Sequence, residues 1–215
     1  MSYACTPIVF VVDTDRSTRE YLERLIRNVD WQVETFASPE DFLAYPRNAA
    51  VSCLIVDAAL PSLAGLALQR QIASERFPIP IIFLSGYCDI ETTVRAMKGG
   101  AFDFLTKPIH DELLLSVMRD AIKRSETLLG RESELHQLRA GYGSLTPRER
   151  EVMSLVAAGL PNKMVGGELG ISEITVKMHR GNVMRKMQAV SFAHLVNMAA
   201  KLRVARPLVQ SALTA

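Results

Sequence analysis

The 215-residue sequence lacks the features that mark several classes of protein. No apolar run approaches the roughly 20 residues that a helix needs to cross a bilayer. Residues 1–7 lack a basic region, and the apolar run that follows, 8–12, is too short for a signal peptide. The three cysteines, Cys5, Cys53 and Cys88, are scattered and have no metal-ligand spacing. These absences predict a cytoplasmic protein whose thiols are buried or inert.

Charge is distributed unevenly along the chain. Residues 144–215 contain ten Lys or Arg and four Glu, a net charge of +6. Residues 1–143 contain fifteen Lys or Arg and nineteen Asp or Glu, a net charge of −4. Such asymmetry predicts two domains and a polyanionic partner for the second. A basic face that is only solvated would give the same counts.

Apolar runs and helical patterns alternate five times in the first half of the chain. We expect strands over residues 8–12, 31–36, 51–56, 79–84 and 102–105. We expect helices over residues 17–29, 39–45, 66–73, 90–98 and 111 to about 128. Continuous apolar strands that alternate with helices are typical of a parallel sheet with helices on both faces. The predicted fold is therefore α/β, with a five-stranded, doubly wound sheet of the flavodoxin-like kind.

Polar side chains follow four of these strands. Asp13 and Asp15 come after the first, Asp57 after the third, Ser85 after the fourth and Lys107 after the fifth. The carboxyl ends of parallel strands lie at one edge of a sheet, so these groups should converge there. Clustered carboxylates repel and need a cation, and their hard oxygens suit Mg²⁺. A carboxylate beside Mg²⁺, a hydroxyl and a lysine is equipped to accept a phosphoryl group.

Residues 7 to about 125 resemble the receiver domain of two-component response regulators. The motifs that carry the resemblance are Val11-Val12-Asp13, Asp57 with Pro61 and Gly65, Ser85-Gly86, and Phe104-Leu105-Thr106-Lys107-Pro108. The resemblance implies that Asp57 is phosphorylated and that Asp13, Asp57 and the backbone carbonyl of Ala59 bind Mg²⁺. It also implies that Lys107 binds the phosphoryl group. Ser85 and Phe104 match the hydroxyl and the aromatic ring of the activation switch.

One position departs from the receiver pattern. The family usually has two adjacent acids after the first strand, but the second position here is Thr14. Loss of a carboxylate should weaken Mg²⁺ binding and slow phosphoryl transfer. Three interpretations follow: the site works with weaker Mg²⁺, Asp15 compensates, or the receiver acts without phosphate and Asp57 is a remnant.

Residues 126–143 are predicted to be a helical linker. Leu128, Leu135, Leu138 and Tyr142 recur at helical spacing among interspersed charges. The stretch is either the last receiver helix running on or a short coiled-coil-like contact. Residues 141–143, Gly-Tyr-Gly, predict a break before the next domain.

The second half is predicted to be a small all-α domain. Thr146 is a candidate N-cap and Gly159 a stop for its first helix, and further helices are expected over 162–169, 173–187 and 191–202. A helix, a glycine-containing turn and a second helix form the helix-turn-helix that binds DNA. The stripe expected to face the core of the 173–187 helix consists of Val176, Val183, Met184 and Met187.

This half resembles the LuxR-type helix-turn-helix, and the whole chain resembles the FixJ subfamily of NarL/FixJ transcriptional regulators. The motifs are residues 145–152 (LTPREREV), Gly159, Asn162-Lys163, residues 169–172 (LGIS), residues 175–180 (TVKMHR) and residues 183–187 (VMRKM). The resemblance implies that Lys177 and Arg180 contact DNA. It places four further residues near the DNA backbone, namely Thr175, Asn162, Lys163 and Lys186.

Two further features of this half bear on stability and assembly. Gly166-Gly167 departs from the family pattern and should weaken its short helix. The 191–202 helix resembles the family's dimerisation helix, with an apolar face formed by Phe192, Leu195, Val196 and Ala199. The same face could equally close the core of its own domain.

The sequence thus predicts a transcription regulator, not an enzyme, with a receiver (1–125), a linker (126–143) and a DNA-binding domain (144–215). Its expected partners are a sensor histidine kinase, promoter DNA, RNA polymerase and a second copy of the chain. Phosphorylation should favour dimerisation through the face around residues 90–104, and the regulator should activate transcription. The alternative is a phosphorylation-independent DNA-binding regulator whose degenerate receiver serves protein interaction or ligand sensing.

Overall fold

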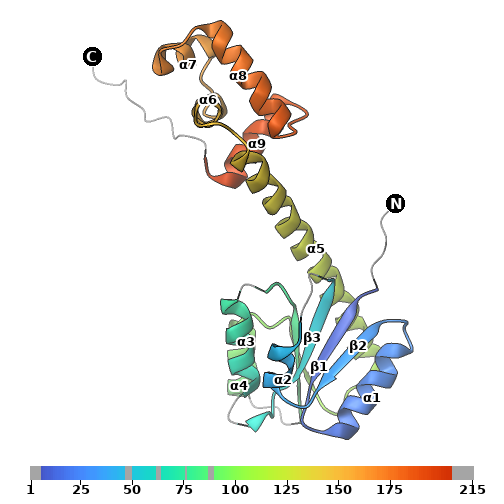
Figure 1. The fold of residues 1–215 in the computed structure, drawn as a ribbon. Helices are drawn as coiled ribbons and strands as arrows, with labels where there is room; N and C mark the ends of the chain where they lie inside the picture. The colour runs from blue at the N-terminus through green and yellow to red at the C-terminus, as the bar shows by residue number, and fades with distance from the viewer. Residues whose placement is uncertain (1–5, 47–49, 62–63, 76, 87–89, 205–215) are drawn as a thin grey trace. The chain divides into compact units, whose positions relative to one another are not determined.

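The computed structural model describes residues 6–46, 50–61, 64–75, 77–86 and 90–204 (Figure 1). The chain divides into two compact units between Gly130 and Arg131. The predicted boundaries at residues 125 and 143 stay predictions. Among the helices in the described ranges, none has the length and apolar character that spanning a membrane requires.

The first unit is built on a five-stranded parallel sheet in the order β2-β1-β3-β4-β5. The strands are β1 (Ile8–Val12), β2 (Gln32–Phe36), β3 (Ser52–Asp57), β4 (Ile81–Ser85) and β5 (Asp103–Thr106). All six residues of β3 and all five of β4 are buried. Strands covered on both faces have no solvated side, which explains their continuous apolar sequences. The predicted α/β fold is confirmed, with β1 at its predicted bounds and the bounds of the other strands shifted by up to two residues.

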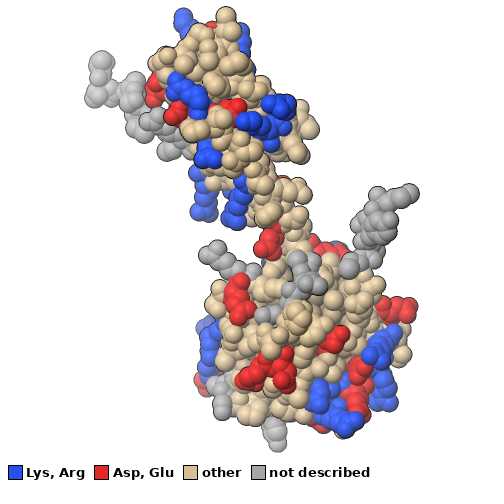
Figure 2. Space-filling model, viewed as in Figure 1, with Lys and Arg blue, Asp and Glu red and all other residues tan. Residues whose placement is uncertain are grey.

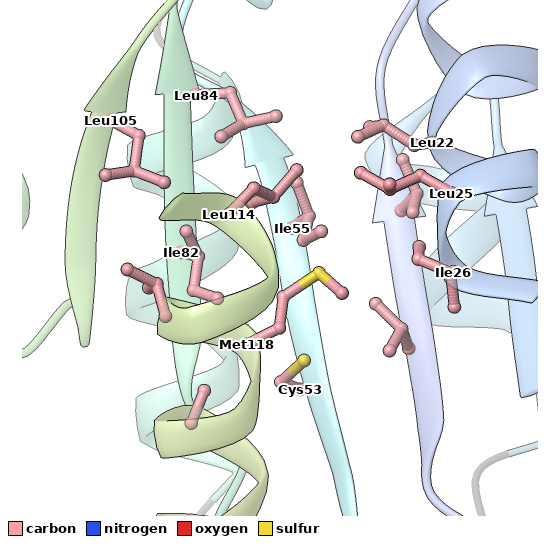
Figure 3. Packing of buried hydrophobic residues seen from close by; sticks show 14 of the residues in the cluster. Leu22, Leu25, Ile26, Cys53, Ile55, Ile82, Leu84, Leu105, Leu114 and Met118 are labelled. Atoms are coloured by element: carbon pink, nitrogen blue, oxygen red, sulfur yellow. The ribbon is translucent and has the colours of Figure 1, made fainter. Parts of the chain in front are cut away.

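Helices cover both faces of the sheet. They are α1 (Arg16–Arg27), α2 (Pro39–Ala44), α3 (Ala64–Ser74), α4 (Ile90–Lys98) and α5 (Asp111–Gly143). Leu22 of α1 and Met118 of α5 belong to the core on one face, which Figure 3 shows around Ile55 and Ile82. Phe42 of α2 and Ala96 of α4 belong to the core on the other face. The β3 strand contributes to both cores, so its end is held from both sides.

Cys53 lies in this core and is fully buried. Burial raises the pKa of its thiol to about 12, so the thiol stays protonated and unreactive. The prediction of a buried, inert thiol is confirmed for Cys53, whereas Cys5 and Cys88 lie outside the described residues.

Helix α5 runs without a break through the stretch predicted as a linker. It spans 33 residues and includes Gly130 and Gly141. The final turns belong to the second unit, where Leu138 is buried in the core and Tyr142 packs against it. Lys201 also bonds Glu134 of this segment at 2.6 Å. The interpretation of a helix that runs on is therefore the one observed, and the predicted break at residues 141–143 is only its end.

In the described part of the second unit, the end of α5 is followed by α6 (Pro147–Ala157), α7 (Asn162–Leu169), α8 (Glu173–Lys186) and α9 (Phe192–Leu202). Thr146 caps α6 and forms a reciprocal capping box with Glu149, as the sequence predicts. Ser172 caps α8 by accepting a hydrogen bond from the Thr175 N–H. The turn between α7 and α8 contains Gly170 in the left-handed conformation, with φ of +66°, which glycine adopts at little cost. Helix, tight turn and helix follow as predicted.

The adjacent glycines of α7 have different environments. A Cβ on Gly166 would lie 2.7 Å from the carbonyl oxygen of Ile171, whereas a Cβ on Gly167 would meet nothing within 4 Å. Close packing of α7 on the following turn therefore requires Gly166. Gly167 makes no such close approach, so at that position glycine only lowers the stability of the helix.

Substituting these two glycines should have opposite effects on the second unit. Gly167→Ala should raise its free energy of unfolding by up to about 1 kcal/mol, because alanine favours helix. Gly166→Ala should lower it, because the new Cβ collides with a backbone carbonyl. Thermal unfolding of the full chain measures both. A stabilising Gly166→Ala would contradict the close approach.

Candidate functional site

The carboxyl edge of the sheet brings together three charged side chains from different strands. Asp13 follows β1, Asp57 ends β3, and these two strands pair in parallel. Lys107 follows β5, and its Nζ lies 2.9 Å from Oδ2 of Asp13 and 3.2 Å from Oδ2 of Asp57. One ammonium group thus bridges two carboxylates. The convergence predicted from the strand ends is observed.

Burial strengthens this bridge. Asp13 is 1% exposed and Asp57 is 9% exposed. Burial raises the pKa of Asp13, although hydrogen bonds from Lys107 and from the Asp15 N–H oppose the shift. Burial alone would lower the pKa of Lys107, but its bond to Asp13 and the charges of both carboxylates raise it. The lysine therefore stays charged beside the two carboxyl groups.

The second oxygen of Asp57 is also fixed. Its Oδ1 accepts a hydrogen bond from the Ala59 N–H at 2.9 Å. A Cβ on Gly65, at the start of α3, would lie 3.1 Å from the carbonyl oxygen of Asp57 and 3.2 Å from Val56. The close approach of α3 to the end of β3 explains the glycine. The turn after β3 thus holds the Asp57 carboxylate, and α3 packs closely against the Asp57 backbone.

The predicted switch residues lie on neighbouring strands. Ser85 ends β4 and is buried, and its carbonyl accepts a hydrogen bond from the Lys107 N–H at 2.7 Å. Phe104 on β5 is half-buried and stacks on Phe83, with ring centroids 6.2 Å apart. This backbone hydrogen bond holds Lys107 beside the end of β4. Phe104 lies on β5, the strand that pairs with β4.

Asp15 has a different structural role from Asp13. It caps α1, where its carboxylate accepts hydrogen bonds from the Ser17 N–H at 3.0 Å and the Thr18 hydroxyl at 2.8 Å. These bonds, that from Thr18 foremost, lower the pKa of Asp15. Thr14, between the two acids, is exposed. The structure does not bring Asp15 to the Asp13–Asp57 pair, so compensation by Asp15 has no geometric support.

Arg19 is a residue of the site that the sequence analysis missed. Its guanidinium donates hydrogen bonds to the carbonyl oxygens of Asp13 at 2.7 Å and Thr14 at 3.0 Å. It thereby fixes the turn that carries Asp13. In the sequence Arg19 is one of several charged residues on α1, and nothing in the pattern distinguishes it.

The donor set fits a small hard cation. The carboxylates of Asp13 and Asp57 and the carbonyl of Ala59 all supply oxygen, which Mg²⁺ prefers. Among the residues that the structure describes, no three or more His, Cys, Asp or Glu side chains gather into a metal-binding group. If Asp13, Asp57 and the Ala59 carbonyl bound Mg²⁺ as predicted, further coordination positions would be left to water or phosphate oxygens.

The second candidate site lies on α7 and α8. Val176 and Val183 of α8 are fully buried in the core of the second unit, and Met187 follows them on the same side. The opposite face of α8 is exposed and includes Lys177, Ile174 (79% exposed) and Met178 (58% exposed). The predicted core stripe is confirmed. The sequence analysis missed Ile174 and Met178, which the helical offset from the buried valines would have placed outside.

The predicted DNA contacts differ in their surroundings. Lys163 and Lys177 are exposed, and Lys177 lies 3.5 Å from Glu173. Arg180 is half-buried and donates a hydrogen bond to Asn162 of α7 at 3.2 Å. In Figure 2 the face in view of this unit carries more blue than red. Lys177 is therefore exposed to solvent, whereas Arg180 lies at the edge of α8 beside α7.

Lys186 has a different partner from the one the resemblance implied. Its Nζ lies 2.7 Å from Oε2 of Glu149, which is buried, and 3.3 Å from the carbonyl of Ser144. The bond from Lys186 and that from the Thr146 N–H lower the pKa of Glu149. Lys186 therefore ties the end of α8 to the start of α6, and its predicted contact with the DNA backbone stays a prediction.

Much of the predicted dimerisation face of α9 is also occupied within the domain. Leu195 and Ala199 are fully buried in the core. Val196 is partly exposed and Phe192 is 38% exposed. Two of the four residues predicted to form the dimerisation face are therefore core residues of their own domain.

The fold and the two sites define a class of protein: a receiver with an aspartate, an acid partner and a lysine at its sheet edge, followed by a helix-turn-helix domain. Residues 9–119 match the family model "Response regulator receiver domain", and residues 143–204 match "Bacterial regulatory proteins, luxR family". The chain belongs to the two-component DNA-binding response regulators of the FixJ/NarL type. It is a transcription regulator and not a conventional enzyme.

Relatives match both units. Nodulation protein W of Bradyrhizobium diazoefficiens is 45% identical over 197 residues, which cover 92% of this chain and 87% of that protein. Transcriptional regulatory protein FixJ of the same organism is 36% identical and covers 89% of this chain and 93% of its own. The solved structure of the response regulator StyR has a TM-score of 0.80 at 42% identity, covering 92% of this chain and all of its own. Membership implies a kinase and DNA as partners, and receivers typically use Mg²⁺.

The role of Asp15 as a cap can be separated from a role in metal binding. Asp15→Ser keeps a capping side chain and removes the carboxylate, so it should leave both Mg²⁺ affinity and the melting temperature of the first unit nearly unchanged. Asp15→Ala should lower that melting temperature by a few degrees. Calorimetry and Mg²⁺ titration of the full chain measure the two effects. A large loss of Mg²⁺ affinity in Asp15→Ser would show that Asp15 reaches the metal.

Proposed function

We propose that Asp57 accepts a phosphoryl group from a sensor histidine kinase and that this modification controls DNA binding. The observation that carries the proposal is the Lys107 bridge, with Nζ 2.9 Å from Asp13 and 3.2 Å from Asp57. A buried carboxylate beside a charged lysine can attack phosphorus while the ammonium stabilises the charge of the transferred group. An oxygen of Asp57 forms the new P–O bond as the bond to the donor nitrogen breaks.

Mg²⁺ fits this site through Asp13, Asp57 and the carbonyl of Ala59, and when bound it supplies charge stabilisation to the phosphoryl oxygens. Lys107 then contacts the phosphoryl group, and Asp13 keeps the edge of the sheet negative enough to hold the cation. The exposed Thr14 supplies no carboxylate. We therefore expect Mg²⁺ binding that is weak but sufficient.

The signal leaves the site through β4, β5 and α4. We propose that the Ser85 hydroxyl turns toward the phosphoryl group and that Phe104 moves inward. The α4 surface beside this path exposes Ile90 (76%), Met97 (44%) and Val94 (43%) to solvent. Exposed apolar side chains that cluster on one helix mark an interaction surface. This surface supports a phosphorylation-favoured dimer through the face around residues 90–104.

In the second unit we propose that α8 enters the major groove. Lys177 would contact the DNA, while the exposed Ile174 and Met178 offer apolar contacts to thymine methyl groups. Arg180 would contact a phosphate from the edge beside α7.

The remaining predicted contacts, Thr175, Asn162 and Lys163, would lie near the DNA backbone. Thr175 is in the first turn of α8, and Asn162 and Lys163 open α7. Sequence-independent phosphate contacts of this kind fix a protein's position on the duplex. We further propose that the protein acts in the cytoplasm and activates transcription with RNA polymerase.

Phosphorylation at Asp57 is directly testable. A small phosphodonor with Mg²⁺ should label the wild-type protein, and Asp57→Asn should abolish the label because an amide replaces the nucleophilic carboxylate. Asp120→Asn, at an exposed position on α5, is the matched control and should label normally. Mass spectrometry of the peptides gives the readout. A label that persists in Asp57→Asn would contradict the assignment.

Thr14 motivates one alternative, a regulator whose receiver acts without phosphate. Thr14→Asp restores the acid that the receiver pattern has at this position, so the phosphoryl-transfer account predicts tighter Mg²⁺ binding and faster labelling. The alternative predicts that promoter activity stays unchanged. Labelling rate and reporter transcription, measured on the same pair of proteins, distinguish the two. A large gain in transcription would argue against the alternative.

A further inference from the structure

Arg180 is held by residues from two other helices. Its guanidinium donates a hydrogen bond to Oδ1 of Asn162 on α7 at 3.2 Å. On α9, the ring of Phe192 lies under the same group, with Cζ of Arg180 4.2 Å from the ring centroid. Three helices thus fix one cation at the edge of the helix-turn-helix.

Phe192 is not part of the domain core. Leu195 and Ala199, one turn and two turns further along α9, are fully buried in the hydrophobic cluster of this unit. Phe192 is 38% exposed and does not belong to that cluster. Its described ring contact is the one with Arg180. The position of the ring is therefore explained by the cation that it supports.

Stacking of this kind has a consequence for binding. A guanidinium over an aromatic face is attracted by the ring, and it keeps its N–H donors directed outward in the plane of the group. Asn162 occupies one donor, and the others of the five remain for a further acceptor. An arginine already held in place loses less conformational freedom when it binds a phosphate.

We propose that Phe192 is a positioning residue that orients Arg180 toward a DNA phosphate. This inference rests on the proposed function, because it requires Arg180 to contact DNA. It assigns Phe192 a role different from dimerisation, for which the resemblance of α9 had placed it. The specific contribution of the ring is its π face, which an aliphatic side chain of similar bulk does not provide.

Substitutions at Phe192 test the role of the ring. Phe192→Leu keeps apolar bulk but removes the π face, and Phe192→Tyr keeps the face. The readout is the affinity of the full chain for a short duplex DNA of fixed, arbitrary sequence, measured over a range of salt concentrations. Phe192→Leu should weaken binding by about three- to tenfold and reduce the slope of log affinity against log salt by up to about 0.9. Phe192→Tyr should retain the wild-type affinity and slope.

A matched control is the second arginine–aromatic pair of this unit, in which Arg150 lies over Tyr142 at 5.2 Å. It is formed by α5 and α6, outside the helix-turn-helix. Tyr142→Leu removes a contact of the same kind and should leave the salt slope unchanged. Equal losses of slope in Tyr142→Leu and Phe192→Leu would overturn the specific role of Phe192.

Arg180→Ala separates failure of the inference from failure of the proposed contact. If Arg180→Ala leaves affinity and slope unchanged, the proposed DNA contact of Arg180 is overturned. If it weakens binding but Phe192→Leu does not, the positioning role alone is overturned. In the Arg180→Ala background, Phe192→Leu should cause no additional loss. A full additional loss there would show that the ring acts through general packing and would also overturn the inference.

Discussion

The ion bridge between Lys107 and the two buried carboxylates is the interaction on which the first unit depends. Two acids at the ends of adjacent parallel strands would repel each other in a site so poorly exposed to water. The ammonium offsets that repulsion, and the turn after β5 must deliver it within hydrogen-bonding distance of both. The strand order β2-β1-β3-β4-β5 achieves this by gathering the carboxyl ends of β1, β3 and β5 at one edge. Phosphorylation of one acid would change this balance of charge.

The sequence predicts the sheet and its charged edge because both follow from local pattern. The buried strands β3 and β4 are continuous apolar runs, and the polar residue that ends each run marks the edge. The surroundings of Arg19 and Lys186 could not be predicted in this way. Their partners are a pair of carbonyls and the distant Glu149, and only the folded chain brings these groups within reach. Sequence pattern gives the side on which a residue lies more readily than the group that it contacts.

In the second unit, too, the sequence pattern predicts which residues are buried but not which groups they contact. Helix periodicity places Val176 and Val183 in the core, and the exposed side of α8 follows from that placement. It does not show that Arg180 lies between Asn162 and Phe192, because that arrangement joins α7, α8 and α9. The glycine pair of α7 is similar, since one glycine is required by a carbonyl five residues away and its neighbour is not.

We propose that a charge added at the Lys107 bridge changes how the protein assembles. Sedimentation of the full chain in Mg²⁺, with and without a small phosphodonor, measures this most directly. The protein should sediment as a monomer without the donor and as a dimer with it, and a protein that lacks the acceptor carboxylate should show no such change. The same sedimentation coefficient in both conditions, with phosphate shown to be attached to Asp57, would contradict this proposal.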